Sequence, residues 1–331
     1  MLYRSTGLSG QPIAVSGVVI VPAGPVPPGG RPIVAWAHPT SGVVSRCAPS
    51  LATFLFEQIQ GLRRMVEHGY IVAATDYPGL GTPGPHPYLV GVSEARAVLD
   101  SVRAARAVAG AAASDRFAVW GHSQGGQAAL FTGLIARAYA PELKLAGIAA
   151  AAPATDLRIL QADDIDSDGG RNLTAMTLWS WSQIYGAPLA PVVLPGAERA
   201  VDALSHECIE SVYDLLACHF SQRPLRRQFL KVKDLGAVEP WRGLLRENTP
   251  GPLPPEEPVF LAQGTADQLV RPPVTRRYAR ELCGRGSRVR YLSLPGIGHG
   301  RAAMRSADAA VAWMAGRFAG AAAPSDCGVL R

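Results

Sequence analysis

The sequence predicts an α/β fold in which a mostly parallel central sheet has helices on both faces and carries an inserted, mainly helical cap. Short apolar runs alternate with longer, helix-like runs between residues 13 and 152, as in strands joined by crossover helices. About a hundred residues then separate two strand-like runs, which is more than a crossover needs. We therefore expect a core of residues 1–154 and 256–331 and a cap of residues 155–255.

The individual elements follow from apolar runs bounded by glycine and proline. A chain of 331 residues, 48% of them hydrophobic, can bury a large core. Gly69 ends one helix-like run, and the proline-rich stretch 250–255 returns the chain to the sheet as a stiff linker. The predicted strands are residues 13–21, 33–37, 70–75, 116–120, 145–152, 258–262 and 288–293. The predicted helices are residues 51–68, 93–108, 127–139, 173–185 and 274–283.

The most informative motif is the hexapeptide Gly121-His122-Ser123-Gln124-Gly125-Gly126. It follows a predicted strand and precedes a predicted helix. In that context Gly-x-Ser-x-Gly is typical of a nucleophile elbow, a strained turn that exposes the serine hydroxyl above a sheet. The flanking glycines leave room for the neighbouring strand and helix. Ser123 is therefore the candidate nucleophile, and the alternative is an ordinary glycine-rich turn.

A serine nucleophile needs a base, and the base needs an acid that fixes its tautomer. The expected chain order is serine, acid, histidine. His299 fits as the base because it lies in a glycine-rich loop just after the last predicted strand. Asp267 fits as the acid because it follows strand 258–262, and Glu281 is the nearest competitor but falls on a helix. The other histidines precede the serine, adjoin it or lie in the irregular middle segment: His38, His68, His86, His122, His206 and His219.

The same chemistry needs two backbone N–H donors for the oxyanion of the tetrahedral intermediate. One should be the amide of Gln124, directly after the nucleophile. The other should come from the loop after strand 33–37, which runs His38-Pro39-Thr40. Proline has no N–H, so we expect Thr40 to be the second donor.

Taken together, these motifs resemble the secretory lipase family of α/β-hydrolases, which includes capped fungal lipases and actinobacterial esterases. The resemblance spans nearly the whole chain and implies an α/β-hydrolase fold and carboxylic ester hydrolysis, with Ser123, Asp267 and His299 at the triad positions. Pro39 in place of the usual glycine is the main departure from the family pattern. The segments that carry the resemblance are the elbow, Trp36-Ala-His-Pro-Thr-Ser-Gly42, Cys47-Ala-Pro-Ser50, the stretch from Asp76 to Tyr88, and Gly264-Thr-Ala-Asp267.

We therefore expect hydrolysis of a small-molecule or lipid ester through an acyl-serine intermediate, with no metal and no organic cofactor. Acyl transfer to an alcohol and amide hydrolysis are alternatives on the same triad. A binding protein that keeps the fold without catalysis is an alternative of another class. Neither the acyl-chain length nor the oligomeric state has a signature in the sequence.

The aromatic stretch 173–185 is the most distinctive part of the expected cap. Its apolar residues do not fall on one helical stripe, so the helix should be covered on more than one side. We assign Met176, Trp179 and Trp181 to the wall of the substrate site. The alternative is that they pack within the cap.

The net charge of +6 excludes no partner by itself, but the sequence has no dense basic run and no aromatic ladder. We therefore expect no nucleic-acid partner, and a basic surface with at most a transient attraction to lipid interfaces. No stretch has membrane-spanning character, and the first residues are not a signal peptide. We expect secretion after removal of a leader; a cytoplasmic protein is the alternative.

Five cysteines favour secretion with two disulfides. We pair Cys208 with Cys218 and Cys283 with Cys327, which leaves Cys47 over. Reduced cysteines in the core are the alternative.

One further motif, Asp164-Ile-Asp166-Ser-Asp168-Gly169, matches the first half of a calcium-binding loop. The acid expected at its twelfth position is replaced by Ala175. We therefore favour a solvated acidic turn.

Overall fold

The computed structural model of the protein describes residues 1–165, 167–209, 212–226 and 228–330. Its centre is an eight-stranded sheet in the order β1-β2-β4-β3-β5-β6-β7-β8. The strands β4, β3, β5, β6, β7 and β8 are parallel, whereas β1 and β2 are antiparallel to their neighbours. The strand bounds are β1 Leu2–Thr6, β2 Pro12–Ile20, β3 Arg31–Ala37, β4 Ile71–Thr75, β5 Ala113–His122, β6 Lys144–Ala151, β7 Val259–Gly264 and β8 Val289–Leu294.

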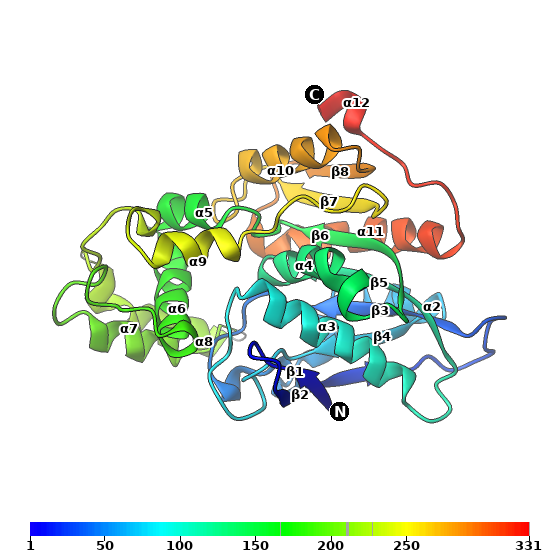
Figure 1. The fold of residues 1–331 in the computed structure, drawn as a ribbon, viewed down its shortest axis with the longest axis horizontal. Coiled ribbons are helices and arrows are strands. Elements are labelled where there is room, and N and C mark those ends of the chain that lie inside the picture. Colours follow the sequence, from blue (N-terminus) through cyan, green and yellow to red (C-terminus); the bar gives the residue numbers. More distant parts are fainter. Residues whose placement is uncertain (166, 210–211, 227, 331) are drawn as a thin grey trace.

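Helices cover both faces of this sheet (Figure 1). On one face α3 (Gly91–Arg106), α4 (Gln124–Tyr139) and α10 (Pro272–Gly284) pack on the strands, and on the other α2 (Leu62–Glu67) and α11 (Ala302–Phe318). The short α12 (Cys327–Leu330) packs on α10. The predicted α/β architecture with a mostly parallel sheet is therefore confirmed.

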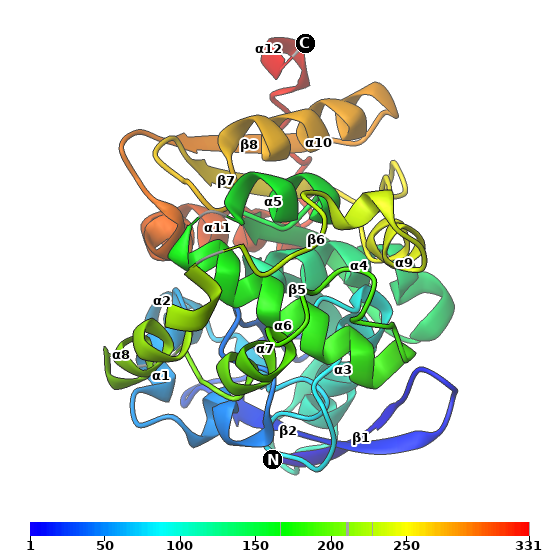
Figure 2. The same ribbon diagram turned by 90° about the vertical axis from the view of Figure 1, so that its left-hand side faces the viewer.

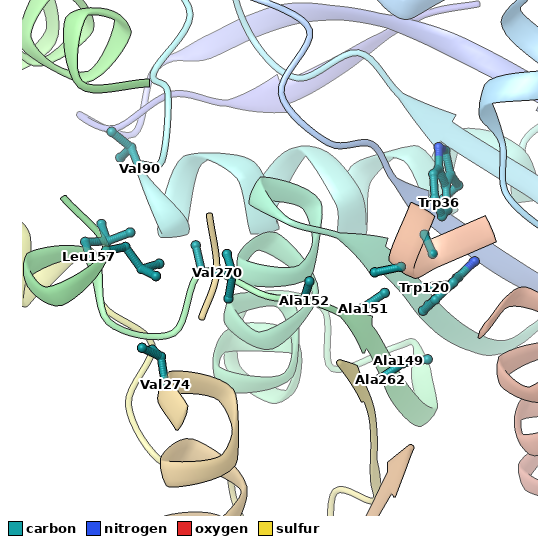
Figure 3. Close-up of a cluster of buried hydrophobic side chains, with 14 of the residues drawn as sticks. Trp36, Val90, Trp120, Ala149, Ala151, Ala152, Leu157, Ala262, Val270 and Val274 are labelled. Carbon is teal, nitrogen blue, oxygen red and sulfur yellow. The ribbon is translucent and has the colours of Figure 1, made fainter. Parts of the chain in front are cut away.

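Successive side chains of a strand point to opposite faces of the sheet, so the two main clusters of the hydrophobic core lie one on each face. Ile33 and Ala35 of β3 point to the α3 and α4 side, whereas Val34 and Trp36 belong to the cluster on the opposite side. Trp36 and Trp120 lie 5.9 Å apart between ring centroids, close to the small residues of β6 and β7 (Figure 3). Strands buried on both faces explain why they appear in the sequence as nearly continuous apolar runs.

Between β6 and β7 the chain forms an inserted segment, residues 152–258, that gathers at one end of the molecule (Figures 1 and 2). Its α-helices are α5 Leu157–Asp164, α6 Asp168–Tyr185, α7 Glu198–Ser205, α8 Val212–Ser221 and α9 Trp241–Glu247, with 3-10 turns η3 Arg223–Arg226 and η4 Leu235–Ala237. The segment returns to β7 through the predicted proline-rich stretch 250–255, which follows the C-cap of α9 at Asn248.

The structure departs from the prediction at the N-terminal strand and over residues 51–68. Strand β1 escaped prediction, since its five residues alternate in burial too briefly to form a pattern. The helix expected over 51–68 is broken into η2 (Pro49–Leu51), α1 (Leu55–Gln58) and α2. Gly61 has a φ of 84°, a left-handed conformation that interrupts a right-handed helix. A further turn, η1 (Ser45–Cys47), precedes η2.

Candidate active site

The turn between β5 and α4 holds Ser123 in a strained backbone conformation, with φ 56° and ψ −116°. Non-glycine residues rarely adopt a positive φ, and they do so mostly where surrounding structure enforces it. Here the enforcement comes from close packing. A Cβ on Gly121 would lie 2.0 Å from the carbonyl oxygen of Gly125, and a Cβ on Gly125 would lie 2.0 Å from that of Ala37. The predicted elbow is thus present, and its glycines are sterically required.

The structure brings Ser123, His299 and Asp267 together, from the ends of three different strands. The Nε2 atom of His299 lies 2.8 Å from Ser123 Oγ, and its Nδ1 atom lies 2.9 Å from Asp267 Oδ2. An ionised carboxylate can only accept, so Nδ1–H donates to Asp267 and Nε2 is left to accept from the serine hydroxyl. This is the tautomer that a general base requires.

Asp267 is fixed by the turn that follows β7. Its side chain is fully buried. Its Oδ1 accepts from the amides of Leu269 (3.0 Å) and Val270 (2.9 Å), and its Oδ2 accepts from Gln263 Nε2 (3.1 Å). Glu281, the competitor in the sequence, lies on α10 with its side chain 59% exposed and paired with Arg277. The geometry therefore favours Asp267 over Glu281.

Another histidine supports this group and was set aside in the sequence because it adjoins the serine. The ring of His122 lies 5.0 Å from that of His299 between centroids, and its Nε2 is 3.0 Å from the His299 carbonyl oxygen. Burial lowers the pKa of His122 to about 3, so that it is neutral and donates Nε2–H to that carbonyl. His122 therefore anchors the main chain of His299, the candidate base.

The two expected oxyanion donors come from different segments of the chain. Gln124 is the first residue of α4, where a backbone N–H has no acceptor within the helix. Thr40 lies on the loop after β3, and its Oγ1 is 3.0 Å from the hydroxyl of Tyr88.

Two cavities meet at Ser123 and His299. The larger has a volume of about 310 Å³ and runs along the loop after β3, with Thr40, Asp76 and Leu55 in its wall. The smaller, of about 70 Å³, lies beneath the inserted segment. Its wall is mainly aliphatic: Leu89, Leu157, Leu160, Leu173, Leu235, Leu245, Leu269 and Val270.

None of the three residues assigned to the substrate wall lines either of these cavities. Met176 and Trp181 are fully buried. Trp181 donates from Nε1 to the Tyr88 carbonyl at 2.9 Å, and Trp179 donates to Asp202 at 2.9 Å. The structure thus supports the packing alternative for these side chains. Helix α6 instead turns Leu173, Thr174 and Thr177 toward the smaller cavity.

The disulfides differ in one pair from the expected set. Cys283 pairs with Cys327 as predicted, but Cys208 pairs with Cys47 and not with Cys218. Cys218 is buried on α8 as a free thiol, and its Sγ donates to the carbonyl of Cys208 at 3.4 Å. The correct bond links the loop region after β3 to the inserted segment, a contact between residues 161 apart that spacing alone does not reveal.

The calcium-like motif falls partly outside the described residues, since Asp166 is not among them. Asp168 pairs with Arg171 on α6. Within the described ranges, no group of three or more His, Cys, Asp or Glu residues is arranged to hold a metal ion.

Comparison with known proteins places this site in a family. The model of the family described as "Secretory lipase" matches residues 55–326. The chain belongs to the secretory lipase family. Lipase 5 of Candida albicans (strain SC5314 / ATCC MYA-2876) is 25% identical over 99% of this chain and 73% of its own length. The crystal structure of Candida antarctica lipase A superposes with a TM-score of 0.83 at 18% identity, over 99% of this chain and 78% of that chain, and shows the α/β-hydrolase fold.

Membership of the secretory lipase family supports carboxylic ester hydrolysis. A Mycobacterium tuberculosis (strain CDC 1551 / Oshkosh) protein named "Probable inactive lipase MT1628" is 30% identical over 47% of this chain and 37% of its own length. The secretory family and the two disulfides suggest secretion. No helix among the described residues is long and apolar enough to cross a bilayer.

Proposed function

We propose that the protein is a serine hydrolase that cleaves carboxylic esters through an acyl-serine intermediate. The observation that carries this proposal is the hydrogen-bonded series from Ser123 Oγ through His299 to Asp267, with distances of 2.8 and 2.9 Å. A complete series of this kind argues for catalysis over a binding protein that merely keeps the fold.

In the first half-reaction, Ser123 Oγ attacks the ester carbonyl carbon while His299 Nε2 takes the hydroxyl proton. Collapse of the tetrahedral intermediate breaks the bond to the alcohol oxygen, which leaves with the proton from Nε2. Water then attacks the acyl-serine in the same way and releases the acid. Asp267 keeps Nδ1 protonated and stabilises the imidazolium that forms in each step.

The amides of Thr40 and Gln124 are the proposed oxyanion donors. The first-turn position of Gln124 supports this role, because N–H groups at a helix N-terminus point outward and favour negative charge. The position of Thr40 in the wall of the larger cavity, beside Ser123, supports the second. Pro39, which precedes it, has no N–H to offer.

We assign the acyl chain to the smaller cavity and the alcohol to the larger one. The smaller cavity is aliphatic and holds roughly five water-sized groups, which suits a short acyl chain. Residues 155–255, as the proposed cap, form most of its roof. The sequence assigned Met176, Trp179 and Trp181 to this wall; we now propose Leu173 and Thr177 in their place.

A lipid ester would present the rest of its surface to the mouth of the larger cavity. Leu55 and Ile59 line that cavity, and three neighbouring side chains are exposed: Leu51 (67%), Phe54 (66%) and Phe56 (59%). Large apolar side chains exposed together are typical of a contact surface. We propose that this segment meets aggregated lipid substrate. Acyl transfer to an alcohol or amide hydrolysis on the same triad is the second candidate, because the larger cavity admits nucleophiles other than water.

The test is labelling with a fluorophosphonate probe, together with turnover of p-nitrophenyl esters from acetate to palmitate. We expect labelling and turnover in the native protein, with short acyl chains preferred. Ser123→Ala should abolish labelling and lower kcat by about 10³-fold or more. Ser306→Ala is the matched control, because Ser306 is a buried serine on α11 that bonds only to its own helix. Labelling that persists in Ser123→Ala would assign the nucleophile elsewhere.

A further inference from the structure

A fully buried carboxyl group lies behind the proposed oxyanion hole and has no role in the mechanism above. Glu94, in the first turn of α3, has no exposed surface. Its Oε1 accepts two hydrogen bonds, from Gln124 Nε2 at 2.7 Å and from the backbone amide of Leu89 at 2.9 Å. Its Oε2 is buried without a hydrogen-bond partner among the described residues. Buried carboxyl groups are rare without a cation, and among the described residues the basic group recorded near Glu94 is the imidazole of His86, 4.0 Å from Oε1.

The side-chain amide of Gln124 is held at both of its hydrogens. His86 Nδ1 lies 2.9 Å from the carbonyl oxygen of Pro78, so Nδ1 carries the proton and Nε2 is an acceptor. Gln124 Nε2 lies 2.9 Å from that Nε2 and 2.7 Å from Glu94 Oε1. The two N–H groups therefore have one acceptor each, which fixes the orientation of the amide. The side chain of Gln124, whose backbone N–H is one of the proposed oxyanion donors, is thus anchored.

Glu94 is also connected to the other proposed donor. The amide that it holds belongs to Leu89, a non-glycine residue at φ 55° that lines the smaller cavity. The preceding residue, Tyr88, places its hydroxyl 3.0 Å from Thr40 Oγ1. One carboxyl oxygen thus ties together the Gln124 side of the hole and, through Leu89 and Tyr88, the Thr40 side.

We propose that Glu94 is a positioning residue that fixes both oxyanion donors, one through Gln124 and the other through Leu89 and Tyr88, and that it does so as a neutral carboxylic acid. The proposal rests on the function proposed above, since it assigns Glu94 to the same reaction. It explains why both hydrogen bonds reach Oε1: a neutral carboxyl accepts at its carbonyl oxygen and carries its proton on the other oxygen.

The surroundings of Glu94 favour the neutral form. Burial raises the pKa of Glu94 to about 8, although the bonds from Gln124 and Leu89 oppose the shift. The titratable groups that face it are His86, whose pKa burial lowers to about 3, and Tyr77, Tyr88 and Tyr185, whose pKa values burial raises. All four are neutral near pH 8, so none compensates a charge on Glu94. Ionisation above pH 8 would place a negative charge next to the oxyanion hole, where it would repel the oxyanion that forms in the transition state.

The test compares Glu94→Ala and Glu94→Gln in the full chain, with kcat and KM for a soluble short-chain ester measured from pH 6 to 10. Glu94→Ala should lower kcat about 10- to 100-fold with KM nearly unchanged, because displaced donors weaken the transition state more than the substrate complex. Glu94→Gln keeps a carbonyl oxygen for both bonds and cannot ionise. It should restore kcat at pH 7 to within about threefold, and it should lack the fall in kcat that we expect of the native protein as the pH rises through about 8.

Asp100→Asn is the matched control, because Asp100 is a buried carboxylate on the same helix that bonds Ser5 and Tyr139 away from the site. Its pH profile should follow that of the native protein. A kcat for Glu94→Ala near the native value, or equal impairment of both Glu94 variants, would overturn the proposal. If Glu94→Ala is insoluble, an unchanged alkaline fall in Glu94→Gln overturns it. Each of these outcomes leaves the proposed function intact, which fails instead if Ser123→Ala is active.

Discussion

Ser123 lies between a wall formed by the ends of the sheet strands and a wall formed by helices of the inserted segment, and these two walls are built in different ways. The sheet wall carries Ser123, Asp267 and His299 on turns at strand ends, and hydrogen bonds of 2.8 to 3.1 Å hold these side chains in place. The helical wall, from α5, α6, η4 and α9, offers mainly leucine side chains and few polar atoms. The difference separates the two tasks of the site: backbone geometry on the sheet side fixes the proposed chemistry, whereas side-chain volume on the helical side sets what fits.

This comparison predicts that a polar change on the sheet wall abolishes turnover without unfolding the protein. Asp267→Asn should lower kcat by about 10³- to 10⁴-fold while substrate still binds, because an amide favours the wrong tautomer of His299. Steady-state kinetics and the melting temperature measure the two effects. Glu281→Gln is the control and should be silent, since Glu281 is exposed on α10. An active Asp267→Asn together with an inactive Glu281→Gln would reverse the assignment.

The backbone of the sheet wall should tolerate no extra atom. In Gly125→Ala the new Cβ would lie 2.0 Å from the carbonyl oxygen of Ala37, and neither backbone can move without shifting the elbow. We expect a loss of about 3 kcal/mol or more in the free energy of unfolding. Gly316→Ala on α11 is the control, where no atom lies within 4 Å of the added Cβ. It should raise stability by about 0.5–1 kcal/mol. Urea denaturation measures both.

The two faces of α6 allow the helical wall to be tested directly. Thr177→Phe should fill part of the smaller cavity and lower the ratio of kcat/KM for octanoate over acetate esters by roughly tenfold. Trp181→Ala should cost about 3–5 kcal/mol of stability and leave that ratio unchanged, because Trp181 packs away from the cavity against Trp241. A changed ratio in Trp181→Ala would restore Trp181 to the substrate wall.

The smallest effect concerns the exposed apolar segment beside the larger cavity, which contains Phe54 and Phe56. The double variant Phe54→Ser and Phe56→Ser should bind phosphatidylcholine vesicles and hydrolyse emulsified ester roughly 5- to 10-fold less well than the native protein. Turnover of a soluble ester should be unchanged, since neither side chain lines the cavity. Val329→Ser is the control, a 78% exposed side chain on α12. If the double variant binds vesicles as well as the native protein does, this segment is not the lipid contact.

The sequence predicted the sheet wall better than the helical wall, and the reason is physical. A buried strand, a tight turn and a required glycine each produce a recognisable local sequence pattern, so Ser123, Asp267 and His299 could be located from short motifs. The orientation of α6 produces no such pattern. Apolar residues occur on all sides of this helix, so either face could have met the substrate. Glu94 was missed since an acid in the first turn of a helix is ordinarily solvated. Its burial depends on Gln124 and Leu89, which only the fold brings near.

The bond between Cys47 and Cys208 has a consequence for how the protein reaches its native state. The bond closes a loop of 161 residues that includes Ser123. In an unfolded chain, Cys208 meets Cys218, ten residues away, roughly 60-fold more readily than it meets Cys47, by loop-closure entropy alone. Oxidation before folding therefore favours the wrong partner and leaves Cys47 unpaired. Production in an oxidising compartment with a thiol–disulfide isomerase should yield more native protein than oxidation of the denatured chain.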